Sequence, residues 1–439
     1  MYYNNPSFNY VAGVVLSAER STFFDYLIQA IFCLLFLGLY MNQGGHNTTA
    51  FLSLCICVPY LFKHREAVVD FFSSFRLFYT FVFLYVFLYI SINLYHFGFD
   101  DGLKYALQRI RWVLFVAVML PAFFVCSQKA CSKKIVKIFL LLFIVLSIII
   151  LSDSLLRFYD SNNNIAHFFG SSHLSLGRPG WLYNPIVFSK IALFSCLAFL
   201  LLVIQVENKA VKWVFFFLSV IWLVASIITQ VRAAWIGIFL AFIFVIVFSR
   251  SKKVSLFLLL IGILLLSVIV TNNNFSPRIK NMFNASSFSE QYRLGQWEAN
   301  LKLSLDHPVL GVGYAKNRNP DLMKEYVTNE KLGYGQPHNQ YIDIIAGVGY
   351  PAFFIWLYML FLPVFYGLRL TFGLAGSFRF VPLAAVFFNI FMLTTILFDK
   401  LNSIGWLCIV YSWLLIFYLY KKHFLSDGGN NDVPASINS

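Results

Sequence analysis

Charged residues are scarce in this chain of 439 residues. Asp, Glu, Lys and Arg make up 12% of it, about half the share in an ordinary soluble domain, whereas 59% is hydrophobic. This composition excludes a soluble enzyme, a disordered chain and a DNA-binding domain, and it predicts a polytopic membrane protein. The net charge of +14 therefore does not indicate a nucleic-acid partner, because a basic balance carries that meaning only in a soluble chain.

Cysteine and histidine are also few, with seven and eight residues. No Cys/His spacing of the kind that holds zinc occurs, and His167 and His173 have no carboxylate nearby at ligand spacing. The cysteines lie in or beside apolar runs that we expect in the membrane or on its inner side, so a disulfide framework is not predicted. We therefore expect no metal ion and no cofactor.

Long apolar runs, in contrast, are abundant. A helix that crosses a bilayer needs about 20 apolar residues, because ~30 Å of hydrocarbon is spanned at ~1.5 Å per residue. The first run follows a polar start and has no small-residue cleavage site after it, so we expect a retained span and no removable signal peptide. The predicted fold class is an all-α polytopic integral membrane protein with about twelve transmembrane helices, near residues 24–41, 47–62, 77–97, 110–126, 135–152, 186–205, 212–229, 233–249, 254–271, 344–367, 380–398 and 404–420.

Lysine and arginine in the connections between these runs predict the orientation. They gather in the even-numbered connections and again after the last run, at Lys421 and Lys422. Short loops rich in these residues remain in the cytoplasm. Both termini are therefore expected to be cytoplasmic, and the two longest connections are expected on the outer side.

This orientation divides the chain into four parts. Residues 1–271 hold nine predicted helices and a smaller outer segment at 152–185. Residues 272–341 form a large outer loop, 342–420 hold the last three helices, and 421–439 form a cytoplasmic tail. Because a short connection would suffice to join two spans, long loops are frequent places for function.

Arg232 lies in the stretch Thr-Gln-Val-Arg-Ala-Ala-Trp, where the seventh run turns into the eighth. Charge near the depth of the hydrocarbon is unfavourable and marks functional sites. The alternative interpretation is an interfacial arginine whose side chain extends to the lipid phosphates.

Arg293 belongs to a helix predicted inside the large loop. Ser287 and Glu290 have the spacing of a capping box, and Asp306-His-Pro ends the helical run. Arg293 lies on a track beside an apolar stripe, and the alternative to a functional role is the polar edge of an amphipathic helix lying on the membrane. The stripe consists of Leu294, Trp297, Leu301 and Leu305.

His338 and Asn339 come directly before the next apolar helix. A histidine at this position can act as a base near neutral pH, or it can be an interfacial residue bonded to water. We expect Gly347 and Gly349 to let another helix approach closely and Pro351 to kink the helix.

Two further outer residues complete the set. Asp399, at the outer end of the eleventh run, either pairs with Lys400 or orients a base or an arginine. Arg178, among aromatic and turn-forming residues in the smaller outer segment, is suited to contact a sugar or a phosphate, although turn-forming composition explains most of that stretch.

The order of these elements resembles the O-antigen ligase family, which is also similar to O-antigen polymerases and bacterial protein O-oligosaccharyltransferases. The family pattern is His, then Asn, Ser or Gln, nine residues, Gly, two residues, and Gly, Thr or Tyr. Here it runs from His338-Asn339 to Gly349, and it departs at the last position, which is Ala352. The stretches around Arg232 and Arg293 resemble those of the family's two essential arginines, and Asp399 matches its acid. The similarity extends from about 178 to 403.

This resemblance implies transfer of a glycan on the periplasmic face of the bacterial inner membrane. The donor would be an undecaprenyl-diphosphate-linked polysaccharide, and the acceptor a sugar hydroxyl of lipid A–core in lipopolysaccharide biosynthesis. Arg232, Arg293, His338 and Asp399 are then the predicted catalytic residues, and Arg178, Trp297 and Asn339 the predicted substrate-binding residues. No nucleic acid takes part.

Other functions remain open. An O-antigen polymerase uses the same class of donor, and we favour the ligase because the His-Asn motif ends one dominant loop. A protein O-oligosaccharyltransferase is a third possibility. A twelve-span transporter would place ionisable residues near the bilayer midplane, whereas here the spans are nearly free of charge and the ionisable residues gather on one face.

Overall fold

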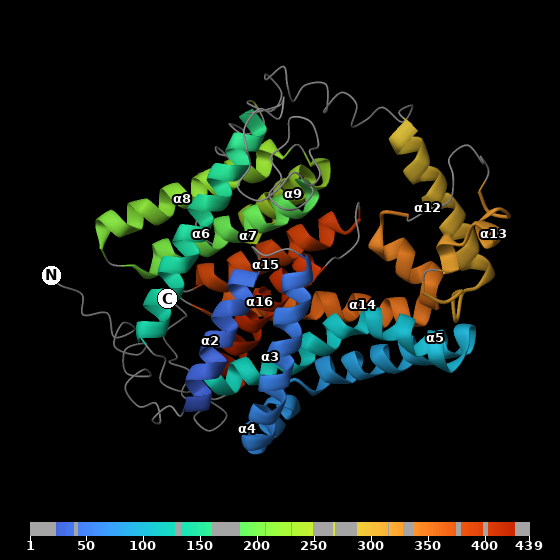
Figure 1. Ribbon diagram of the computed structural model, residues 1–439, viewed down its shortest axis with the longest axis horizontal. Helices are drawn as coiled ribbons and strands as arrows, with labels where there is room; N and C mark the ends of the chain where they lie inside the picture. The colour runs from blue at the N-terminus through green and yellow to red at the C-terminus, as the bar shows by residue number, and fades with distance from the viewer. Residues whose placement is uncertain are drawn as a thin grey trace, which may run out of the picture.

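The computed structural model describes twelve stretches of the chain (Figure 1): 23–38, 43–127, 133–159, 185–206, 208–229, 231–248, 267, 288–314, 316–327, 337–374, 379–397 and 403–425. Throughout these stretches the regular secondary structure is helical and includes no strand, which confirms the predicted all-α class. The predicted span at 254–271 lies, except for Ser267, outside the described residues.

The helices follow one another along the chain from α2 to α16. They are α2 (Phe23–Gly38), α3 (Gln43–Lys63), α4 (Arg65–Ser74), α5 (Arg76–Ser127), α6 (Lys133–Tyr159), α7 (Pro185–Gln205), α8 (Lys209–Ile228), α9 (Arg232–Phe248), α12 (Phe288–Asp306), the 3-10 helix η1 (Lys316–Arg318), α13 (Pro320–Met323), α14 (Gln340–Gly373), α15 (Phe380–Thr395), α16 (Ser403–Tyr420) and the short π-helix η4 (Lys421–Leu425).

Four of the described helices are long and apolar enough to cross a membrane, which supports the predicted helical membrane protein. Shorter apolar helices pack around them at Ala50–Lys63, Leu140–Ser152 and Phe380–Thr395. The four long segments are Arg76–Ser127, Pro185–Val203, Lys209–Ile228 and Gln340–Gly373.

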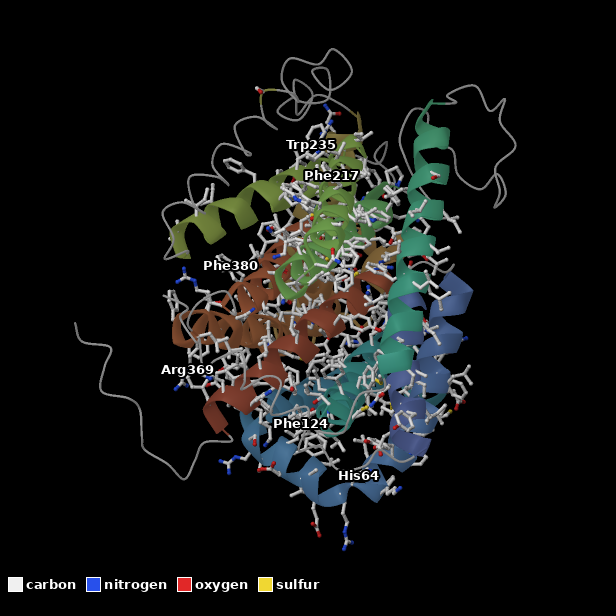
Figure 2. The ribbon with its side chains drawn as sticks, turned by 90° about the vertical axis from the view of Figure 1, so that its left-hand side faces the viewer. His64, Phe124, Phe217, Trp235, Arg369 and Phe380 are labelled. Atoms are coloured by element: carbon white, nitrogen blue, oxygen red, sulfur yellow. The ribbon has the colours of Figure 1, made fainter. Side chains whose placement is uncertain are left out.

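Aromatic side chains fill much of the space between the helices (Figure 2). At one end of the bundle the ring centroids of Phe71 and Phe124 are 5.1 Å apart. Basic residues lie at the same end: Lys421 pairs with Asp70 at 2.8 Å, and Arg369, on α14, donates a hydrogen bond of 2.7 Å to the Tyr420 hydroxyl. This end therefore collects several of the bases that the sequence assigns to the cytoplasmic side.

Helix α5 is a hairpin of two helical arms and contains the predicted spans 77–97 and 110–126. Gly98 bends the chain with φ of 73°, a conformation that glycine adopts without strain. The arms run antiparallel (Figure 1), and the Tyr79 hydroxyl on the first donates to the carbonyl of Ala117 on the second at 3.2 Å. The bend lies at the same end of the molecule as α12 and α13 (Figure 1).

Helix α14 is broken at Gly349, where φ is 78° and ψ is 173°. A break leaves helical N–H and C=O groups without partners inside the helix. The turn 308–313, which follows α12, fills the break and bonds to these groups. The hydrogen bonds run from Val312 N to Ala346 O (3.0 Å), from Gly313 N to Gly347 O (2.8 Å) and from Tyr350 N to Pro308 O (2.8 Å).

The close packing expected at Gly347 and Gly349 is therefore with a turn and not with another helix. The expected kink falls at Gly349, two residues before Pro351. A side chain at Gly349 would collide with the carbonyl oxygen of Val309. Glycine is required here both for the backbone conformation and for the space that the turn occupies.

We expect Gly349→Ala to reduce the unfolding free energy by at least about 2 kcal/mol, because strain at positive φ and a backbone collision act together. Gly98→Ala is the matched control, since Gly98 has nearly the same φ but no heavy atom within 4 Å of an added Cβ. Its cost should be about 1 kcal/mol of strain alone. Thermal unfolding in detergent measures both variants, and equal losses would contradict the role of the turn.

Candidate functional site

His338 lies on the turn that leads into α14, and its side chain is exposed. It has a φ of 50°, the only positive φ among the described non-glycine residues. A residue with a β-carbon adopts this conformation at a free-energy cost, which the surrounding contacts must offset. The turn is therefore held by its neighbours in a conformation that it would not adopt alone.

Two of the predicted substrate-binding residues hold this turn. Asn339 is the N-cap of α14: its side-chain oxygen accepts hydrogen bonds from Tyr341 N at 3.0 Å and Ile342 N at 3.2 Å. The indole N–H of Trp297, on α12, donates to the Pro337 carbonyl at 2.6 Å. The structure thus brings His338, Asn339 and Trp297 together, and contact of the latter two with substrate stays a prediction.

Helix α12 begins and ends where its sequence predicts, at Phe288 and Asp306. Its apolar stripe faces outward, with Leu294, Leu301 and Leu305 between 42% and 69% exposed. The neighbouring polar track of Gln296, Asn300 and Ser304 is fully buried, as are Ala299 and Leu303. Arg293 precedes this track by one turn and is partly buried. The helix therefore turns its polar track toward the protein and leaves the three leucines of the stripe exposed.

Arg232 is the first residue of α9 and is partly buried. Helix α9 packs against α15, where Gly237 contacts the ring of Phe391. The end of α15 reaches the His338 turn, because Gln340 N donates to the Ile396 carbonyl at 2.9 Å. Helix α9, which begins with Arg232, and helix α14, which follows the His338 turn, consequently both contact the C-terminal part of α15.

Arg178 and Asp399 lie outside the described residues. The interpretations given for them from the sequence therefore stay predictions.

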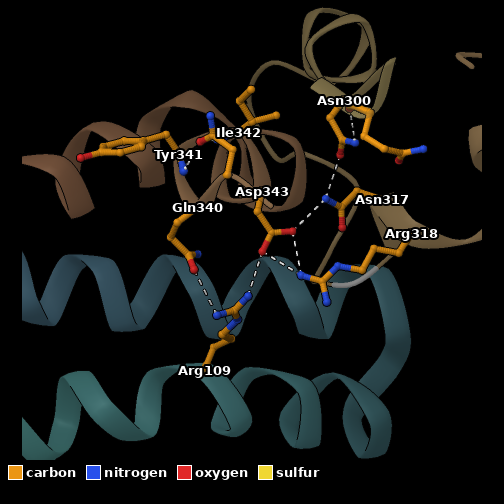
Figure 3. A network of polar contacts seen from close by, with 10 residues as sticks. Arg109, Asn300, Asn317, Arg318, Gln340, Tyr341, Ile342 and Asp343 are labelled. Carbon is orange, nitrogen blue, oxygen red and sulfur yellow. Dashed lines mark hydrogen bonds and ion pairs between the residues drawn. The ribbon is translucent and has the colours of Figure 1, made fainter. Parts of the chain in front are cut away.

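A buried network of charges lies just after the His338 turn, centred on Asp343 (Figure 3). The Asp343 carboxylate accepts from Arg109 Nη2 at 2.8 Å, from Arg318 Nη2 at 2.8 Å to each oxygen, and from Asn317 Nδ2 at 3.1 Å. Its side chain is 6% exposed, and those of Arg318 and Arg109 are 17% and 19% exposed. Such charge-assisted hydrogen bonds compensate for the desolvation of a carboxylate.

The network extends from Asp343 to three other parts of the fold (Figure 3). Asn317 Nδ2 also donates to the side-chain oxygen of Asn300 on α12 at 2.9 Å. Arg109, on the second arm of α5, reaches Gln340 at 3.4 Å and lies 4.8 Å from the centre of the Tyr314 ring. Helices α5, α12 and α14 and the segment 314–318 are thus joined by polar side chains.

The cavity beside this network is small, about 20 Å³, and is lined by Tyr85, Tyr89, Arg109 and Asp343 among others. This volume accommodates about one water molecule. The network is therefore packed inside the protein and leaves no room for a sugar in this cavity.

The sequence did not single out Arg109, Arg318 or Asp343. The predicted spans begin at 110 and 344, so Arg109 and Asp343 each fall one residue before an apolar run. An ionisable residue at such a border needs a partner, and that rule is the signal that could have drawn attention to them. It could not have paired them, because 234 residues separate the two.

These observations define a helical membrane protein with a polar site where α12, α14 and the bend of α5 meet. Residues 216–357 match the family model described as O-antigen ligase, and this range contains Arg232, Arg293 and His338. The match covers about a third of the chain and supports membership of the O-antigen ligase family. A comparison with curated proteins finds no match.

The N-cap contacts predict the effect of changing Asn339. Asn339→Ala should lower the unfolding free energy by about 1 kcal/mol, because two backbone N–H groups of α14 lose their acceptor. Asn339→Asp, which keeps a capping oxygen, should retain most of the stability. Thermal unfolding in detergent checks the pair, and Asn208→Ala at the N-cap of α8 gives the cost of losing a similar cap elsewhere.

Proposed function

We propose that this protein is an O-antigen ligase, which transfers polysaccharide from an undecaprenyl-diphosphate carrier to a sugar hydroxyl of lipid A–core. The observation that carries the proposal is the family match over 216–357, which includes both arginines and the histidine of the predicted site. Members of this family act on lipid-linked glycans as ligases or polymerases, and the match therefore supports an enzyme of this general class.

The proposal includes a placement in the bacterial inner membrane. Twelve spans, both termini in the cytoplasm and a periplasmic loop at 272–341 follow from the apolar runs and from the distribution of Lys and Arg. The nine helices of 1–271 and the three of 342–420 would then enclose the site, with 421–439 as the cytoplasmic tail.

Arg232 and Arg293 would hold the diphosphate of the donor. When the bond between the sugar and the phosphate breaks, negative charge develops on the leaving diphosphate. Guanidinium groups bind phosphate through two parallel hydrogen bonds and remain charged, so two fixed arginines can stabilise this charge. The proposed reaction uses no metal ion.

His338 would accept the proton of the acceptor hydroxyl. The hydroxyl oxygen then forms a bond to the anomeric carbon of the donor sugar, the bond from that carbon to the phosphate oxygen breaks, and undecaprenyl diphosphate leaves. An exposed imidazole on a rigid turn suits this role, because general-base catalysis requires a fixed distance to the proton. Asp399 would support the charges, and Arg178, Trp297 and Asn339 would contact the substrates.

We expect His338→Ala to lower glycan transfer by about 10²–10⁴-fold, the usual contribution of a general base. The measurement is lipopolysaccharide on a gel from cells that lack their own ligase. Long-chain O-antigen at the normal level, on variant protein expressed like the parent, would rule out the catalytic role.

Arginine-to-lysine changes test the diphosphate contacts. Arg232→Lys and Arg293→Lys keep the charge but lose the planar fork, so each should reduce transfer at least ~tenfold. Lys302→Ala, on the same helix as Arg293 but in an exposed pair with Glu298, is the control and should leave transfer unchanged. Full activity in both lysine variants would show that bidentate binding is not required.

One reconstituted assay separates the alternatives. Purified protein receives a labelled lipid-linked donor with either lipid A–core or additional donor. A product on lipid A–core supports the ligase, whereas elongation of the lipid-linked chain identifies a polymerase. Transfer to neither acceptor would contradict the proposed function.

A further inference from the structure

The Asp343 network joins the two elements that carry the predicted catalytic residues. Helix α12 bears Arg293, and its Asn300 accepts a hydrogen bond from Asn317. Asn317 also bonds to Asp343, which lies five residues after His338 in the first turns of α14. One side chain, Asn317, therefore spans the gap between these helices.

The network also fixes α14 against α5. Arg109 bonds to Asp343 and to Gln340, so one guanidinium contacts two residues on the first turn of the helix that follows His338. The backbone N–H of Gln340 also donates a hydrogen bond to the carbonyl of Ile396, at the end of α15. The start of α14 consequently has restraints from α5 and α15.

Arg318 brings the chain after α12 into the same contact. Its Nη2 lies 2.8 Å from both carboxylate oxygens of Asp343. The turn 308–313 between α12 and Arg318 fills the break of α14, so the connection is held at both of its ends. Movement of α12 relative to α14 would require breaking both sets of contacts.

We infer that Asp343 is a positioning residue. Through its contacts with Arg109 and Arg318, it sets the distance and orientation of Arg293, on α12, relative to the His338 turn. This inference rests on the proposed function for its catalytic consequence. Asp343 itself is buried and touches no space large enough for a sugar, so it acts through its partners. Misplacement of a reacting group by about 1 Å can lower a rate by 10²-fold, which shows how a buried carboxylate can control turnover.

Asp343→Asn is the central variant, because it keeps the size of the side chain and removes the charge that binds both arginines. We expect kcat to fall by about 10²-fold, with less than about threefold change in the KM for the donor. Asp343→Glu retains the charge and should recover part of kcat. A variant in which kcat is unchanged would overturn the inference.

A matched control separates positioning from stability. Asn389, on α15, is buried and bonds to Ser412 and Trp413 of α16. Asn389→Ala should therefore also lower the thermal midpoint, but it should leave the kcat of the folded fraction unchanged. An equal loss of kcat in Asn389→Ala and Asp343→Asn would show that reduced stability explains both.

A double-mutant cycle, measured on kcat, tests whether Asp343 acts through Arg293. If Asp343 acts by positioning Arg293, the Asp343→Asn change should lower the rate much less in an Arg293→Lys background than in the parent. Additive effects of the two changes would contradict the coupling.

A measurement without activity makes the inference independent of the ligase assignment. The His338→Cys substitution, in full-length protein whose native cysteines are replaced, reports how firmly the turn is held through its rate of maleimide labelling in detergent. Asp343→Asn should change this rate at least about threefold, and Asn389→Ala should not. An unchanged rate would overturn the inference even if ligation is observed. A changed rate, together with no ligase activity in the parent protein, would support the positioning role and contradict the proposed function.

Discussion

A single buried carboxylate organises this end of the molecule. Burying Asp343 would be unfavourable unless cations and amides replaced its water, and here two guanidinium groups and Asn317 do so. These partners come from α5 and from η1, so satisfying one charge fixes segments that are far apart in the sequence. His338 lies five residues before this carboxylate, on the turn that leads into the same helix.

The break of α14 imposes a second constraint of the same kind. Backbone groups released at Gly349 cannot remain without partners inside a protein, and the turn 308–313 provides them. Two stretches therefore contact each other through their backbones. One is the family pattern from His338 to Gly349, and the other is the stretch 307–314. Their glycines serve this contact, because Gly311 and Gly349 both have positive φ and both lie against backbone.

The sequence predicted those features that depend on neighbouring residues. Asp306 gave the end of α12 correctly, and the apolar runs predicted the all-α class and helices long enough to cross a membrane. The motif residues predicted the family whose model matches residues 216–357. The pairing of Arg109 with Asp343 could not be predicted, because it depends on how a hairpin bend at Gly98 places one helix beside another. The outward direction of the leucines on α12 was likewise a property of tertiary packing.

That outward direction follows from the same network. Helix α12 buries Gln296, Asn300 and Ser304 together with Ala299 and Leu303, and leaves the leucines of the stripe exposed. Asn300 faces inward because Asn317 bonds to it, and Leu303 packs in a small apolar cluster with Val312 and Met323. Both contacts bind the same side of the helix to the segment that follows it. Leu294, Leu301 and Leu305 lie on other positions around the helix and therefore stay on its surface.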